Sequence, residues 1–170
     1  AANENALETV SELVKQLPAD KWKISPIMII PFARVKIQDY IGQILGVRHS
    51  LVLIGERPGL GSPDSLSAYF TYKPRWESVE SDRNCISNIR MQGMPPKIAA
   101  RKLALLLGES LRLGIGGTAL KDNIDDAKLL ESQIQPLPAS EYCRRRKVMA
   151  FHSGGGSAPK LGYFAMRKGL

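Results

Sequence analysis

Glu56 occupies the position in this sequence that best suits a binding site. It follows a short apolar run, Leu-Val-Leu-Ile at residues 51–54, and precedes a turn rich in glycine and proline at residues 57–61. Ligands of open α/β sheets bind just beyond the carboxyl ends of strands. Burying a carboxylate there costs several kcal/mol unless it is hydrogen-bonded, and glycine lets a bulky ligand approach the backbone. We therefore predict a binding site at Glu56, although a tight turn without a ligand explains the same pattern.

No set of catalytic residues accompanies Glu56. The glycine-rich turn lacks the spacing of a dinucleotide-binding or phosphate-binding loop, and Gly-Ser-Pro at residues 61–63 lacks that of a nucleophile elbow. The two histidines are far apart and the two cysteines form no C-x-x-C pair, so no Ser/His/Asp set, disulfide framework or metal site is predicted. Cys85 fits either a nucleophile or, more commonly, a small buried hydrophobe. The sequence therefore favours a binding subunit over a complete enzyme.

Composition places the chain among soluble globular proteins. Of its 170 residues, 44% are apolar and 24% are charged, which is ordinary for this class, and the length predicts one domain with a tail. No apolar run approaches the roughly 20 residues of a membrane span, so we expect no membrane partner. Residues 1–15 hold three glutamates and no basic residue before Lys15, unlike a signal or transit peptide. The expected compartment is the cytoplasm.

The basic charge of the chain is concentrated near its end. Residues 139–170 hold seven Lys or Arg and one acidic residue, so they carry +6 of the net charge of +8. Prolines, the basic run at residues 144–147 and three consecutive glycines predict that residues 123–170 form a tail with little core of its own. The basic run could contact nucleic acid, but no aromatic residues are interleaved with it, which favours a solvated tail.

The first half of the chain predicts helices and strands in alternation. Apolar residues recur at helical spacing over residues 5–17 and 35–45, and short apolar runs typical of buried strands occur within 26–32 and at 51–54. Short connections between a strand, a helix and a second strand are typical of a parallel sheet. We therefore predict an α/β fold with a Rossmann-like parallel sheet flanked by helices. Because such folds usually begin with a strand, an N-terminal piece is expected to be missing.

The second half of the predicted domain adds strands and one long helix. Residues 67–73 are rich in aromatic and β-branched types, which predicts a strand, and residues 82–90 fit a short strand or a loop at a sheet edge. Two prolines at 95–96 suit a helix start, and the apolar stripe that follows ends near Gly114. A further helix is predicted at 125–135. The predicted domain therefore spans residues 1–122.

Three blocks of this sequence resemble the small (light) subunit of ethanolamine ammonia-lyase. They are residues 55–69 (GERPGLGSPDSLSAY), residues 33–39 (ARVKIQD) with Gly42, and residues 82–90 (DRNCISNIR). The Pro-Pro helix start and the Ala-Leu-Lys sequence at 119–121 also agree. The resemblance covers residues 3–122. It implies that the chain is N-terminally truncated relative to the family, which has more chain before the first helix, and that residues 123–170 have no counterpart.

The resemblance implies a cofactor-dependent lyase made of two kinds of subunit. The family uses adenosylcobalamin to convert ethanolamine to acetaldehyde and ammonia by a radical mechanism. Its substrate site lies in a barrel-shaped large subunit, and the small subunit closes over the corrinoid at the interface. The catalytic residues are therefore expected on the large subunit and none here, because the cofactor carries the hard chemistry and the protein positions it. Whether such an enzyme lies free in the cytoplasm or in a bacterial microcompartment stays open.

Three residues match the cobalamin contacts of the family: Val35, Glu56 and Cys85. The resemblance implies that Glu56 accepts hydrogen bonds from amide side chains of the corrin, while Val35 and Cys85 pack on the ring periphery. The sequence lacks D-x-H-x-x-G, so the cofactor is expected to keep its own base on cobalt. The alternative is a non-catalytic interaction protein whose basic tail binds an acidic partner or nucleic acid. Salt-sensitive nucleic-acid binding that is lost on deleting residues 139–170 would favour that alternative.

Overall fold

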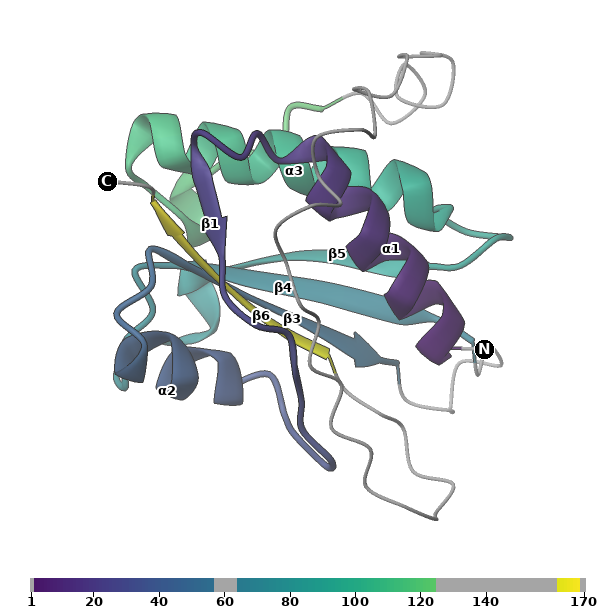
Figure 1. Ribbon diagram of the computed structural model, residues 1–170, viewed down its shortest axis with the longest axis horizontal. Coiled ribbons are helices and arrows are strands. Elements are labelled where there is room, and N and C mark those ends of the chain that lie inside the picture. Colours follow the sequence, from purple (N-terminus) through teal and green to yellow (C-terminus); the bar gives the residue numbers. More distant parts are fainter. Residues whose placement is uncertain (1, 57–63, 125–161, 169–170) are drawn as a thin grey trace.

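Helices cover both faces of one β-sheet in the computed structural model, which describes residues 2–56, 64–124 and 162–168. Helices α1 (Ala2–Gln16) and α3 (Pro96–Leu113) pack against each other on one face. Helix α2 (Ile37–Ile44) covers part of the opposite face (Figure 1). Two short 3₁₀ helices, η2 (Glu80–Asp82) and η3 (Gly117–Ala119), lie in the connections. The architecture is therefore mixed α/β in three layers, as predicted.

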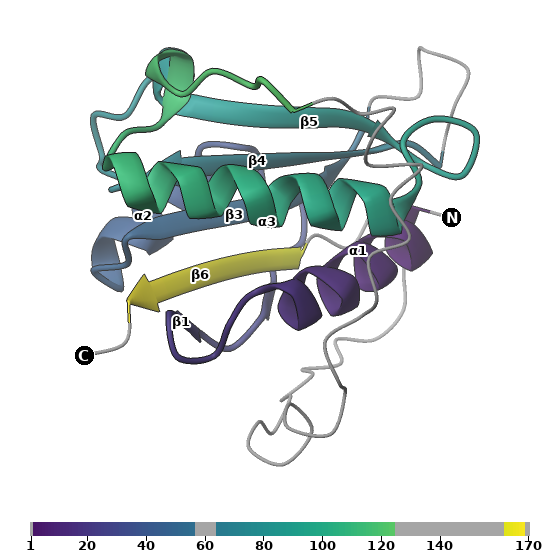
Figure 2. The same ribbon diagram turned by 90° about the horizontal axis from the view of Figure 1, so that it is seen from above.

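The sheet contains six described strands. They are β1 (Trp22–Ile24), β2 (Met28–Ile29), β3 (His49–Gly55), β4 (Leu66–Tyr72), β5 (Arg83–Ile89) and β6 (Gly162–Lys168). The order across the sheet is β1-β6-β3-β4-β5, and β2 also pairs with β6. Every one of these strand pairs is antiparallel. Figure 2 shows β6, which comes from the end of the chain, between β1 and β3.

The prediction of a Rossmann-like parallel sheet is wrong. Neither the β3–β4 nor the β4–β5 connection contains an α-helix among its described residues, and a parallel pair needs a crossover of a dozen or more residues, usually helical. These connections therefore make antiparallel hairpins. The two strands flanking α2 are not neighbours, because each pairs with β6 instead. Since both are antiparallel to β6, β2 and β3 still run in the same direction.

Most predicted elements are present, with shifted ends. The helices expected at 5–17, at 35–45 and from 95–96 to Gly114 correspond to α1, α2 and α3, and the strands at 51–54 and 67–73 correspond to β3 and β4. Residues 82–90 hold a full strand, whereas the strand expected within 26–32 shortens to the two residues of β2. Strand β1 was not predicted. Strand β6 lies within the segment expected to be a tail, and the predicted helix at 125–135 lies outside the described residues.

The two faces of the sheet have separate apolar cores. Leu51 and Leu53 of β3 point toward α1 and α3, and they belong to the larger core together with Phe70 of β4. The residue between them, Val52, belongs to a smaller core on the α2 face. This alternation follows from the two-residue period of a strand. The larger core packs the sheet against α1 and α3. The smaller core has only two buried apolar residues, and polar residues also lie on the α2 face.

One histidine is part of the larger core's boundary. His49 is fully buried between the rings of Trp22 and Tyr72, and its Nε2 lies 2.9 Å from the hydroxyl of Ser110 on α3. That hydroxyl donates its own proton to a backbone carbonyl, so Nε2 carries the ring proton and donates it to Ser110. Burial and, secondarily, the charge of Arg48 lower the pKa of His49 to about 3. The folded protein therefore holds this ring neutral.

Replacing His49 with glutamine is expected to flatten the pH dependence of stability. Unfolding returns the imidazole to its ordinary pKa of about 6.5, so the unfolded state binds a proton that the folded state excludes until the pH approaches 3. Stability must then fall as the pH drops below 6.5, by on the order of 2 kcal/mol between pH 6.5 and 4.5. Urea unfolding at pH 6.5 and at pH 4.5 measures this loss of stability. An equal loss in the wild type and in His49→Gln would contradict the assignment.

Candidate functional site

Three groups of the chain hold the carboxylate of Glu56, which lies directly after β3. Its Oε1 accepts hydrogen bonds from the hydroxyl of Ser67 at 2.6 Å and from the backbone N–H of Asn88 at 2.9 Å. Its Oε2 accepts one from the hydroxyl of Ser65 at 2.6 Å. The donors come from the start of β4 and from β5, so the side chain is fixed across three strands. These bonds supply the partners that a partly buried carboxylate needs, and the binding site predicted at Glu56 stays a prediction.

A bulge in the sheet supplies the backbone donor. Ala68 pairs with Ile86 and Leu66 with Ile89, so two residues of β5 lie opposite one residue of β4. Asn88, one of the two, has a φ of 57°, a left-handed conformation that asparagine tolerates better than most residues. Its N–H is thus released from the ladder and bonds to Glu56. Such bulges re-aim groups near binding sites.

The charge on Glu56 is stabilised by these contacts. Burial alone would raise the pKa of this carboxyl, but the Asn88 amide, the hydroxyls of Ser65 and Ser67 and the charge of Arg90 outweigh burial and lower the pKa below 4.5. Glu56 is therefore ionised at neutral pH and can only accept hydrogen bonds. A carboxylate has about four acceptor positions. Described residues fill both positions on Oε1 and one on Oε2, so one position on Oε2 has no donor among the residues that the structure describes.

Cys85 lies on the same face of the sheet as the donors of Glu56. It pairs with Tyr69 across β4 and β5, and it is a free, exposed cysteine rather than the buried hydrophobe that its residue type favours. Partial burial of the thiol, together with the negative charge of Glu56, raises its pKa against the opposing hydrogen bond from Tyr69. Since the thiolate is the nucleophile, a thiol held protonated does not support the nucleophile alternative.

Val35 approaches this region from the start of α2. It packs with the smaller core around Val47 and Val52, which also includes Ile54 and Tyr69. Glu56 is near enough to Cys85 for its charge to help raise the pKa of the thiol, and Val35 shares its core with Tyr69, the strand partner of Cys85. All three predicted site residues border the α2 face of the sheet. Tyr69, which the sequence did not single out, lies between them.

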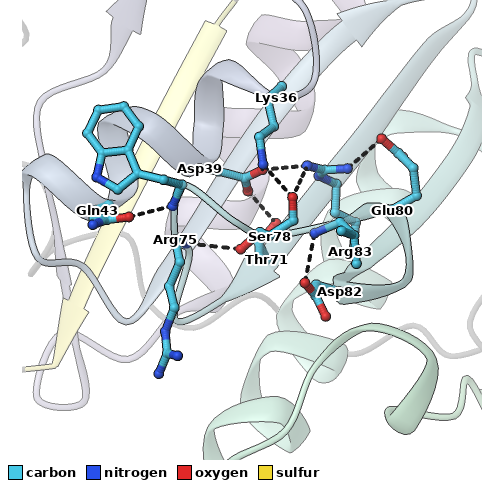
Figure 3. A network of polar contacts seen from close by, with 11 residues as sticks. Lys36, Asp39, Gln43, Thr71, Arg75, Ser78, Glu80, Asp82 and Arg83 are labelled. Carbon is cyan, nitrogen blue, oxygen red and sulfur yellow. Dashed lines mark hydrogen bonds and ion pairs between the residues drawn. The ribbon is translucent and has the colours of Figure 1, made fainter.

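A buried ion pair holds α2 in place beside this region (Figure 3). The side chains of Asp39 on α2 and Arg83 on β5 are 0% and 3% exposed and form a salt bridge. Asp39 also lies 3.3 Å from the ammonium of Lys36 and accepts a 3.2 Å hydrogen bond from Thr71 of β4. Arg83 reaches Glu80 at 2.5 Å with its other terminal nitrogen. Helix α2, which follows Val35 in the chain, is therefore tied to both β4 and β5.

Close approach of α2 to the sheet also depends on one glycine. A Cβ added at Gly42 would lie 2.4 Å from Cγ of Pro74 and 3.1 Å from Cβ of Ser50. The first distance is far shorter than real Cβ contacts, so a larger residue would push α2 away from Pro74 and from the neighbouring Ser50 of β3. Gly42 belongs to the block that resembles the ammonia-lyase small subunit, and steric fit explains its place there.

A polar cavity of about 500 Å³ lies elsewhere, at the far end of β4. Tyr72, Lys73, Arg75 and Gly116 are among its lining residues, and none of the three predicted site residues is. The residues that the structure describes contain no cluster of three or more His, Cys, Asp or Glu suited to a metal ion. No helix in the same ranges is long and apolar enough to cross a membrane.

Comparison with known proteins points to one family. The family model described as "Ethanolamine ammonia-lyase light chain (EutC)" matches residues 1–121. The small subunit of ethanolamine ammonia-lyase from Azotobacter vinelandii is 44% identical over 129 residues, which are 76% of this chain and 48% of that protein. The corresponding protein of Pseudomonas syringae pv. tomato is 37% identical over 161 residues, or 94% of this chain and 53% of the relative.

The extent of these matches bears on the ends of the predicted domain. This chain spans about half the length of the curated relatives it matches. A match that covers 94% of the chain must continue past residue 122. Part of the segment 123–170 therefore has a counterpart in the Pseudomonas relative, contrary to what the resemblance of the three blocks implied.

Breaking the ion pair beneath α2 is expected to destabilise the protein strongly. Arg83→Met leaves the carboxylate of Asp39 buried without its main partner, which typically costs about 3–5 kcal/mol. Adding Asp39→Asn to this variant should restore part of the loss, because the uncompensated charge is then removed. Urea unfolding at pH 7 measures both.

The matched control is Arg112→Met, which removes the exposed partner of Glu109 on α3. Exposed pairs contribute little, so this variant should unfold close to the wild type. A loss in Arg83→Met no larger than in the control would contradict the proposed dependence of α2 on the buried pair.

Proposed function

Because the chain belongs to the ethanolamine ammonia-lyase light-chain family, we propose that it acts as the small subunit of an adenosylcobalamin-dependent ethanolamine ammonia-lyase. The reaction is the conversion of ethanolamine to acetaldehyde and ammonia. The observation that carries this proposal is the family match over residues 1–121. The enzyme would work in the cytoplasm of a bacterium, either free or inside a microcompartment.

The proposal divides the work between two subunits. The large subunit holds ethanolamine and the catalytic residues, and this chain holds part of the corrinoid at the interface between them. Adenosylcobalamin supplies the radical that starts the reaction. The contribution of this chain is to bind the cofactor, to orient it and to cover it from solvent, which is the usual role of protein around a cofactor that performs the difficult chemistry.

The described residues fit a corrinoid on the α2 face of the sheet. The rim of a corrin carries carboxamide side chains and methyl groups, so it needs both hydrogen-bonding and apolar partners. Glu56 is ionised, and one acceptor position on Oε2 that no described residue occupies suits an amide N–H of the corrinoid. Val35 offers an apolar contact beside α2, and Cys85 offers an exposed thiol on β5. In this proposal Val35, Glu56 and Cys85 together bind the cofactor edge.

The interaction-protein alternative has less support. It depends on the basic segment 139–170 acting as an extended arm. Part of this segment, β6, pairs with β1, β2 and β3 near the middle of the sheet. Residues 162–168 are therefore part of the sheet rather than of an extended arm.

The first experiment is co-purification with a large subunit. The chain and the large subunit of a family relative, such as that of Azotobacter vinelandii, are produced together, incubated with adenosylcobalamin and separated by gel filtration. We expect the corrinoid absorbance to elute with the pair and with neither subunit alone. If the large subunit alone binds as much corrinoid as the pair, the proposed role of this chain in binding the cofactor is wrong. Nucleic acid in the peak, lost on deleting residues 139–170, would favour the alternative.

Glu56→Gln is expected to weaken corrinoid binding by the pair about tenfold or more, because hydrogen bonds to charged groups are worth roughly 1.5–3 kcal/mol. Since the pKa of Glu56 is lowered, its contribution should be constant above pH 5 and should disappear as the pH falls through the lowered pKa. Equilibrium dialysis measures the affinity of the pair for the corrinoid at neutral pH and at a pH below the lowered pKa of Glu56.

The control for this variant is Glu109→Gln. Glu109 is a glutamate on α3 that pairs with Arg112 at the surface, on the other side of the sheet from Glu56. Its substitution should leave the affinity unchanged. Equal affinities for Glu56→Gln and Glu109→Gln would exclude Glu56 as a contact.

A further inference from the structure

The three proposed contacts lie on either side of one strand. Glu56 follows β3 and Cys85 belongs to β5, while β4 pairs with both of these strands and lies between them. Val35 reaches the same face from the start of α2. A ligand that touches all three residues must therefore cross β4. The residue that β4 presents at this crossing becomes part of the site.

Tyr69 is that residue. Alternate residues of β4 face α2, namely Ser67, Tyr69 and Thr71. The two residues that flank Tyr69 are buried and already occupied, because Ser67 bonds to Glu56 and Thr71 bonds to Asp39. Tyr69 is only partly buried. It is thus the one of these three side chains that can meet a ligand on this face.

We propose that Tyr69 is a fourth ligand-binding residue of this site and that its phenol hydroxyl donates a hydrogen bond to a carboxamide oxygen of the bound corrinoid. This inference rests on the proposed function, since it needs a ligand that spans Val35, Glu56 and Cys85. It adds a donor to a site whose other fixed polar group only accepts. A primary carboxamide carries both an N–H donor and a carbonyl acceptor, so this combination suits the amide-bearing rim of a corrin.

The surroundings of Tyr69 prepare it for this role. Its ring belongs to the core of Val47 and Val52, which limits its freedom before the ligand binds. Burial and the neighbouring Cys85 raise the pKa of the phenol, so it keeps its proton at neutral pH. In the free protein the hydroxyl interacts with the thiol of Cys85. Sulfur is a weak acceptor, and a carbonyl oxygen that replaces it offers the stronger bond.

The test compares Tyr69→Phe, Tyr69→Ala and the wild type, each as the full chain paired with the large subunit. Equilibrium dialysis with adenosylcobalamin measures binding, and no turnover is needed. Tyr69→Phe keeps the ring and removes the donor, so it should bind about 3- to 10-fold more weakly. Tyr69→Ala should bind more weakly still, because the apolar contact is lost as well.

Two further variants make the result specific. Tyr40→Phe is the matched control: Tyr40 lies on α2 with its ring 4.9 Å from that of Trp76, and its hydroxyl has no part in the proposed site, so the affinity should not change. Urea unfolding of Tyr69→Phe should match the wild type within the small effect of one hydrogen bond, which separates lost binding from lost folding.

The outcomes distinguish this inference from the proposed function. If the wild-type pair binds no adenosylcobalamin, both are wrong. If the wild type binds and Glu56→Gln weakens binding, but Tyr69→Phe binds as well as the wild type, the proposed hydrogen bond is overturned and the proposed function stands. Weaker binding by Tyr69→Phe and unchanged binding by Tyr40→Phe is the result we expect.

Discussion

The buried ion pair between Asp39 and Arg83 is the constraint on which the α2 face depends. Removing two charges from water is expensive, and their attraction offsets this cost only where the geometry is good and further hydrogen bonds are made. Thr71, Lys36 and Glu80 provide those additional partners. Together with these partners, the ion pair joins α2 to both β4 and β5.

The packing of Val35 into one core with Ile54, near the end of β3, does not need the predicted sheet topology. It requires only that the start of α2 and the end of β3 lie at the same edge, which holds when β2 and β3 run in the same direction. They do, because both pair antiparallel with β6. The apolar run of β3 encodes its burial, whereas β2 is only partly buried, and neither run encodes the identity of the strand between them. That strand comes from residues 162–168, more than a hundred positions away, in a segment whose composition resembles a tail.

The position of the acid Glu56 was easier to predict from the sequence than the groups that donate hydrogen bonds to it. The position of Glu56 between an apolar run and a glycine-rich turn correctly indicated an acid that needs hydrogen bonds. Ser65 and Ser67 could have been found from their alternation with Leu66 and Ala68, because two polar residues on one face of a strand are a signal for that face. The backbone amide of Asn88 could not have been found in this way. It is free to bond to Glu56 only because of a bulge, and that bulge becomes evident only when β4 and β5 are paired.

The three sequence blocks behind the family resemblance are physically one unit. The block at 33–39 supplies Asp39, whose partner Arg83 lies in the block at 82–90. The block at 55–69 supplies Glu56, which accepts the amide of Asn88 from that same third block. Each block thus holds one half of an interaction completed by another. A chain with one block altered would lose contacts in a second. For this reason, agreement in all three blocks indicates an assembled face of the sheet, on which a ligand can be held by several segments at once.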